Sequence, residues 1–153
     1  MPQFSFIPAA DTTACAEDVR QLFEELATNL PPEQRAPSGE CRPAVDVLET
    51  NEHVAIVMDL AGTPLAAVRV AFREGALLIV GEKAPPVGAH GHAYHLIERD
   101  FGRFARVVRL TGAFDIGGAS ATLRDGELLI VLPKMNDRRG RVHRIRVRDA
   151  ADR

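Results

Sequence analysis

The sequence contains no tryptophan, one tyrosine and two cysteines among its 153 residues. With so few aromatic side chains, it lacks the stacking platforms on which single-stranded nucleic acids bind. Cys15 and Cys41 show no Cys-x-x-Cys spacing, so we interpret them as free thiols of a reducing compartment, with a disulfide within or between chains as the alternative. The formal net charge of −2 gives no overall attraction to nucleic acids or to anionic membranes.

Signals for membrane insertion, secretion and catalysis are also missing from the sequence. No apolar run approaches the roughly 20 residues that span a bilayer. Residues 1–7 lack the basic start and apolar core of a secretory signal, so we expect a cytoplasmic location. There is no Gly-rich phosphate loop, no Gly-x-Ser-x-Gly motif and no convincing pair of carboxylates. We therefore expect that the protein is not an enzyme and holds no cofactor.

One unit of a turn and a strand occurs twice in the chain. Residues 73–80 read Arg-Glu-Gly-Ala-Leu-Leu-Ile-Val, and residues 124–131 read Arg-Asp-Gly-Glu-Leu-Leu-Ile-Val. An acidic residue followed by Gly suits a tight hairpin, because Gly accepts a positive φ. The apolar run that follows is too short for a typical helix and has apolar residues facing both ways, as in a strand covered on both sides. Two such hairpins indicate a sandwich of antiparallel sheets.

Composition divides the chain into three zones: an N-terminal arm (1–43), a β domain (44–134) and a C-terminal extension (135–153). In the arm, apolar residues spaced by three and four predict an amphipathic helix over residues 13–30. We expect Asp11 or Thr12 to cap its start, and Pro31 with Pro32 to end it. Because the arm offers this helix no partner of its own, it must dock on the domain, on another subunit or elsewhere.

The β domain alternates short apolar strands with Gly-containing turns. No helical stretch joins the strands, which favours a sandwich over a βαβ fold. The predicted strands are residues 45–50, 54–60, 68–73, 77–80, 104–110, 121–123 and 128–132. The extension that follows is rich in Arg and holds one apolar island, Ile145-Arg146-Val147.

Six segments, in order, resemble motifs of the small heat-shock protein (α-crystallin) family of bacterial type. Three residues depart from these motifs: Ala61 and Thr111 replace usual prolines, and Cys41 lies near the place of a frequent aromatic residue. The resemblance covers roughly residues 43–147. The six segments are residues 43–49 (Pro-Ala-Val-Asp-Val-Leu-Glu), 59–62 (Asp-Leu-Ala-Gly), 78–83 (Leu-Ile-Val-Gly-Glu-Lys), 98–106 (Glu-Arg-Asp-Phe-Gly-Arg-Phe-Ala-Arg), 121–128 (Ala-Thr-Leu-Arg-Asp-Gly-Glu-Leu) and 145–147.

This resemblance implies an immunoglobulin-like antiparallel β-sandwich and an ATP-independent holdase chaperone that keeps unfolding client proteins from aggregating. It implies a homodimer that assembles into larger homo-oligomers, with a strand exchanged between partners from the long loop 83–97. Two other classes remain as alternatives. One is a nucleic-acid-binding protein that uses the Arg-rich tail, although a solvated tail that keeps an oligomer soluble is the simpler interpretation. The other is an adaptor that docks on a single partner.

The resemblance also assigns roles to individual residues. Ile145 and Val147, whose side chains point the same way in an extended segment, would enter a groove between two edge strands; a chance motif in a disordered tail is the alternative. The groove would be lined by Val68, Val70, Phe72, Ala121 and Leu123, which can equally be ordinary core. The dimer interface would include Tyr94, Leu96, Glu98, Arg99 and Arg106.

Three further predictions concern single features. Arg106, if buried, would need a carboxylate such as Glu98, Asp100 or one from the other subunit; the alternative is a solvated arginine on a strand. Three histidines of the long loop can be a metal site or, more simply, a solvated polar segment: His90, His92 and His95. Residues of the arm would contact clients and other subunits, unless the helix docks permanently on its own domain: Phe4, Phe6, Ile7, Val19, Leu22, Phe23 and Leu26.

Overall fold

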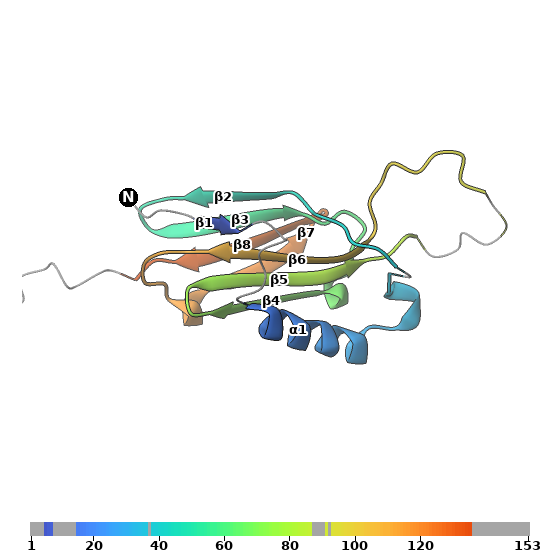
Figure 1. Ribbon diagram of the computed structural model, residues 1–153. Helices are drawn as coiled ribbons and strands as arrows, with labels where there is room; N and C mark the ends of the chain where they lie inside the picture. The colour runs from blue at the N-terminus through green and yellow to red at the C-terminus, as the bar shows by residue number, and fades with distance from the viewer. Residues whose placement is uncertain (1–4, 8–14, 37, 87–90, 92, 136–153) are drawn as a thin grey trace, which may run out of the picture.

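The protein, in a computed structural model that describes residues 5–7, 15–36, 38–86, 91 and 93–135, is a sandwich of two antiparallel sheets (Figure 1). One sheet has the order β1-β6-β5-β4 and the other β2-β3-β8-β7. This confirms the predicted fold class. The first sheet comprises β1 (Ser5–Ile7), β6 (Gly102–Arg109), β5 (Ala76–Lys83) and β4 (Val68–Arg73); the second comprises β2 (Val45–Glu49), β3 (His53–Asp59), β8 (Glu127–Pro133) and β7 (Ser120–Arg124).

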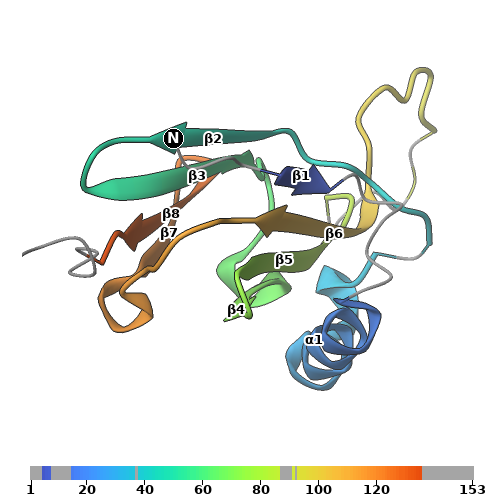
Figure 2. The same ribbon diagram turned by 60° about the vertical axis from the view of Figure 1, so that its left-hand side comes forward.

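The single α-helix of the described residues, α1 (Ala16–Asn29), lies on the outer side of the first sheet, away from the second sheet (Figure 2). Three short 3-10 turns complete the connections: Pro32–Gln34, Leu65–Ala67 and Ile116–Gly118. No helix in this part of the chain combines the length and the apolar character needed to cross a bilayer.

Both repeated units form the predicted two-residue hairpins. Glu74 and Gly75 have φ values of 50° and 78° between β4 and β5, and Asp125 and Gly126 have 51° and 79° between β7 and β8. Positive φ at both central residues defines the turn whose twist matches that of paired strands. The two acidic residues tolerate this conformation, and the glycines adopt it without a steric penalty.

The core lies between the sheets and follows the two-residue period of the strands. In β3, Val54, Ile56 and Met58 are fully buried, while the residues between them are partly exposed. Gly81 of β5 makes room for Phe104, because a Cβ atom at position 81 would lie 2.4 Å from Cζ of that ring. The remaining buried residues of this core are Leu60, Val68, Leu77, Ile79, Val108, Leu110, Leu128, Ile130 and Leu132.

Strand β5 is buried from Ala76 to Glu82, because the core covers one face and α1 the other. It is longer than the predicted 77–80. The predicted strand covers only the apolar run, whereas β5 continues into the charged pair Glu82 and Lys83.

Two segments of the family resemblance contact each other. The Leu60 N–H donates to the carbonyl of Gly126 at 2.7 Å. A Cβ atom at Gly126 would lie 3.1 Å from Cα of Ala61. The turn after β3 therefore packs directly on the hairpin between β7 and β8, which is why both carry small residues.

The described part of the helix starts at Ala16, after Cys15 at the N-cap position, and the Cys15 side chain makes no capping hydrogen bond. The predicted caps, Asp11 and Thr12, lie outside the described residues. Glu17 and Asp18 in the first turn favour a start at this point, because carboxylates stabilise the positive end of the helix dipole. The predicted end is confirmed: Leu30 is extended, and Pro31 and the turn from Pro32 follow.

Candidate functional site

The linker after α1 is held on the start of β6. The Arg103 N–H donates to the Gly39 carbonyl at 3.1 Å, and the Cys41 N–H donates to the Arg103 carbonyl at 2.9 Å. The Cys41 thiol donates to the Gly102 carbonyl at 3.3 Å. Gly102 has φ = 133°, and a Cβ atom there would lie 2.4 Å from the Gly39 carbonyl oxygen. Only glycine allows the linker to approach this closely.

A buried carboxylate joins the linker, the helix and the sheet. Glu82 is 2% exposed; it accepts from the Ala36 N–H at 3.1 Å and from Nε of Arg103 at 3.1 Å. The Cζ of the Arg103 guanidinium also lies 5.4 Å from the centre of the Phe23 ring of α1. A buried charge is costly unless it is paired, so these contacts fix the position of Arg103.

Helix α1 packs on the outer face of the first sheet through its apolar stripe. Leu26 is fully buried, and Asp18 forms an ion pair with Arg73 of β4 at 2.6 Å. Because both partners of this pair retain solvent contact, the pair contributes at most about 1 kcal/mol, and apolar packing holds the helix. The packing residues are Cys15, Val19 and Leu22 of the helix segment and Ala71, Ala76, Leu78 and Val107 of the sheet.

This docking bears on the residues predicted to contact clients. Val19, Leu22 and Phe23 are half-buried, which matches the alternative of a helix docked on its own domain. Phe6 and Ile7 belong to β1, which pairs with β6. Phe4 lies outside the described residues. A role of these residues in client contact stays a prediction.

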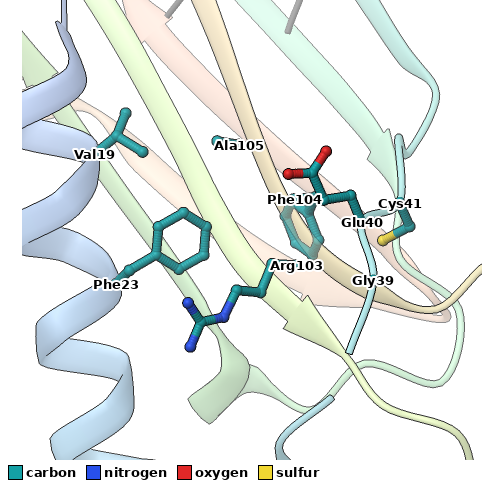
Figure 3. Close-up of a pocket in the computed structure, with 8 residues that line it drawn as sticks. All are labelled: Val19, Phe23, Gly39, Glu40, Cys41, Arg103, Phe104 and Ala105. Atoms are coloured by element: carbon teal, nitrogen blue, oxygen red, sulfur yellow. The ribbon is translucent and has the colours of Figure 1, made fainter. Parts of the chain in front are cut away.

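A pocket of about 620 Å³ opens between α1, the linker and β6. Figure 3 shows Val19 and Phe23 directed from the helix toward the strands, with Arg103 beside Phe23. Its lining mixes apolar side chains with one acidic and one basic residue. The lining residues are Val19, Phe23, Gly39, Glu40, Cys41, Arg103, Phe104 and Ala105.

The predicted groove residues lie on β4 and β7, the edge strands that end the two sheets on the same side of the sandwich (Figure 1). Val68 is buried, Val70, Phe72 and Leu123 pack against the core, and Ala121 is exposed. The structure thus brings the two edges to one side, while most of these side chains also serve as core. Ile145 and Val147 lie outside the described residues.

The loop between β5 and β6 carries the predicted interface residues on its surface. Tyr94, Leu96, Glu98 and Arg99 are all exposed, and the neighbouring Ile97 is 66% exposed. Exposed apolar side chains in such a series mark a surface suited to a protein partner.

Arg106, the remaining predicted interface residue, is buried on β6. Its Nη1 donates to the carbonyl of Pro43 at 2.6 Å. Glu98 and Asp100, two of the candidate carboxylates, are both exposed, and a carboxylate from the other subunit stays a prediction. Burial and, to a smaller extent, the charge of Arg42 lower the pKa of the Arg106 guanidinium. The alternative of a solvated arginine is therefore wrong.

The cysteines and histidines support no further site in the described part of the chain. Cys15 and Cys41 are free thiols, and burial raises the pKa of Cys41. His95 is exposed, whereas His90 and His92 lie outside the described residues. Among the residues that are described, no three His, Cys, Asp or Glu side chains cluster as metal ligands do.

The two-sheet fold, with its open edges and exposed loop, defines the α-crystallin class of β-sandwich. A model of the Hsp20/alpha crystallin family matches residues 46–148. A small heat-shock protein from Xylella fastidiosa has a similar structure, with a TM-score of 0.62 and 29% identity over 72% of this chain and 100% of that chain. Heat shock protein 16.0 from Schizosaccharomyces pombe gives a TM-score of 0.59 and 25% identity over 71% and 99% of the two chains.

Sequence relatives agree with the structural ones. The 18.9 kDa heat shock protein of Oryza sativa subsp. japonica is 35% identical over 97 residues, which are 63% of this chain and 55% of that protein. This chain thus spans about half the length of the rice relative. The chain belongs to the Hsp20/alpha crystallin family. Small heat shock proteins are chaperones that form homo-oligomers and bind client proteins.

Sequence reasoning missed two parts of the site. Strand β1 has three residues, too few to show a period, and only its pairing with β6 reveals it. The contacts of Glu82 were also missed, although a lone carboxylate at the end of the apolar run 77–81 was a usable signal, because a charge there must find a partner.

Proposed function

We propose that this protein is an ATP-independent holdase that binds unfolding proteins and prevents their aggregation. The observation that carries the proposal is the match of residues 46–148 to the Hsp20/alpha crystallin family, a family of chaperones. Clients would be bound through the apolar stripe of the N-terminal arm, where Val19, Leu22 and Phe23 are only half-buried. Adaptable apolar surface of this kind suits partners that share no common shape.

The dimer we propose forms through the loop between β5 and β6. Figure 1 shows the described part of the loop before β6, residues 93–101, extending away from the sandwich. Within the described residues, β2 pairs with β3 on one side only, so its other edge offers backbone donors and acceptors to an extended segment. The loop of one protomer would add to β2 of its partner, with Glu98, Arg99 and Arg106 near the contact.

Larger assemblies would use the tail. Ile145 and Val147 would each gain about 1.5–3 kcal/mol by entering the groove between β4 and β7. Ordering the tail costs about 1–2 kcal/mol per residue, which offsets much of that gain. A single tail contact is therefore weak, and many contacts in one assembly add up. Weak contacts allow subunits to exchange.

The function is tested with a heated model protein whose aggregation is followed by light scattering without nucleotide. We expect the chain to suppress scattering at a near-equal ratio of protomer to client. Undiminished scattering in the presence of an excess of the chain would contradict the holdase function.

The tail is tested separately with the double variant Ile145→Gly and Val147→Gly. Its native mass, measured by light scattering, should be smaller than that of the parent, because both side chains that enter the groove are gone. The matched control is Arg146→Gly, which adds the same flexibility but removes a side chain that points the other way. An unchanged mass in the double variant would rule the tail contact out.

A further inference from the structure

Strand β6 has one edge that its own sheet only partly covers. β5 pairs with β6 along its whole length on one side. On the other side, β1 pairs with residues 107–109, and the linker pairs with Arg103. In the described part of the chain, no residue pairs with Ala105 on this edge.

The backbone of Ala105 faces this edge, which no described residue pairs with at that position. Arg103 exchanges hydrogen bonds with the linker through both its N–H and its carbonyl. Backbone groups alternate between the two edges of a strand. The N–H and carbonyl of Ala105 therefore point to the same edge as those of Arg103 and Val107, where an added strand can bond to them.

A side chain added opposite Ala105 would have a pocket to enter. Cross-strand partners share one face of a sheet, and Ala105 lines the pocket of about 620 Å³ with Val19 and Phe23 (Figure 3). In β1, Ile7 is opposite Val107. A bound strand in the same register would place the residue two positions further along opposite Ala105, beside the pocket.

We propose that this edge of β6 is an acceptor for extended apolar segments of unfolding polypeptides, and that β1 occupies part of it as an internal substitute. The nature of the occupant rests on the proposed holdase function. Its chemistry follows from β1 itself, the sequence Ser-Phe-Ile, which shows that the edge accepts an extended apolar segment. Glu40 and Arg103 give the pocket one charge of each sign, so it favours no charged segment.

β1 is short enough to be displaced. It has three residues, and by the alternation of backbone groups Ser5 and Ile7 bond to β6. Such short edge strands open locally far more easily than a whole domain unfolds. An incoming segment that also pairs with Ala105 and fills the pocket makes a longer ladder than β1 does.

The test locks β1 in place. In a background of Cys15→Ala and Cys41→Ala, the pair Ser5→Cys and Arg109→Cys joins two directly opposite residues, about 5.5 Å apart between Cα atoms, which is within disulfide range. The matched control is a second cross-strand pair far from β6, Thr122→Cys and Leu129→Cys. Each variant is compared oxidised and reduced.

The probe is a synthetic eight-residue peptide of alternating Ile and Thr with one central photoreactive phenylalanine. A second peptide, methylated on alternate backbone nitrogens, cannot donate to a strand edge. We expect the first peptide to label Val19, Phe23 or residues 103–105. Oxidising the β1 lock should reduce this labelling at least tenfold, and reduction should restore it, whereas the control disulfide should have no effect.

Three outcomes would overturn the proposal: labelling that falls elsewhere, labelling that the lock leaves unchanged, or equal labelling by the methylated peptide. A fall in native mass on locking, without a change in labelling, would assign the edge to a second copy of the chain instead. If the peptide labels this edge but the protein does not suppress aggregation, the holdase function is contradicted while the acceptor edge is not.

Discussion

Replacing Arg103 with alanine should release the linker and helix α1 from the first sheet. The side chain donates from Nε to Glu82 and lies over the Phe23 ring. Its loss leaves the buried carboxylate of Glu82 with the Ala36 N–H. The structure thus predicts a cost that an arginine without a buried carboxylate partner would not show.

The magnitude follows from the two contacts. A hydrogen bond to a charged group contributes about 1.5–3 kcal/mol, and the lower half applies here because the Arg103 side chain is 55% exposed. The contact with the Phe23 ring adds about 0.5–1 kcal/mol. We expect Arg103→Ala to lower the free energy of unfolding by about 2–3 kcal/mol.

The matched control is Arg73→Ala. Arg73 also contacts α1, through Asp18 at 2.6 Å, but Arg73 is 62% exposed and Asp18 is 26% exposed. Such a pair contributes about 0–1 kcal/mol. The two arginines thus have the same charge and touch the same helix, and they differ in whether their carboxylate partner is buried.

Urea unfolding followed by circular dichroism measures both variants, at one protomer concentration because assembly stabilises the folded chain. A double-mutant cycle with Glu82→Gln should give a coupling energy of about 1–2 kcal/mol between positions 82 and 103. Trypsin should also cut α1 at the exposed Arg20 faster in Arg103→Ala. A loss of stability no larger than that of Arg73→Ala, or a coupling near zero, would refute the reasoning.

Two further predictions concern the linker. Gly102→Ala should destabilise the protein by more than Gly112→Ala. Both positions have positive φ, but only at Gly102 would a Cβ atom meet a neighbour, the Gly39 carbonyl oxygen at 2.4 Å. Equal urea midpoints for the two variants would contradict the close approach of the linker to Gly102. The pKa of the Cys41 thiol is raised by burial, so its thiolate forms at higher pH in the folded chain than in the unfolded chain. In the variant Cys15→Ala, iodoacetamide should therefore alkylate Cys41 more slowly in the folded protein than in urea, both at pH 8. The free energy of unfolding should fall as pH rises through the folded-state pKa of Cys41. Equal alkylation rates in both states would show that Cys41 is not desolvated.

Much of the sandwich could be predicted from local patterns. The pairs Glu74-Gly75 and Asp125-Gly126 specify their hairpins, because the required positive φ is a property of the residues themselves. The alternation of Val54, Ile56 and Met58 likewise indicates which face of β3 is buried. The motifs that resemble the family added the function, which periodicity alone does not indicate.

The candidate site could be predicted only in part. Arg106 and the loop residues Tyr94 and Leu96 were identified from the motifs. The partner of Arg106 was not, because the Pro43 carbonyl reaches it from a distant part of the chain. The sequence shows that a buried Arg106 needs a partner, whereas the tertiary fold determines which group lies close enough to bind it.

The sequence by itself determined the strands, their turns and the apolar stripe of α1, because each depends on residues close together in the chain. The tertiary structure alone decided where α1 docks, that β1 pairs with β6, and that Glu82 binds Arg103. These contacts join segments separated by many residues, and their energies exist only once the two sheets have brought those segments together.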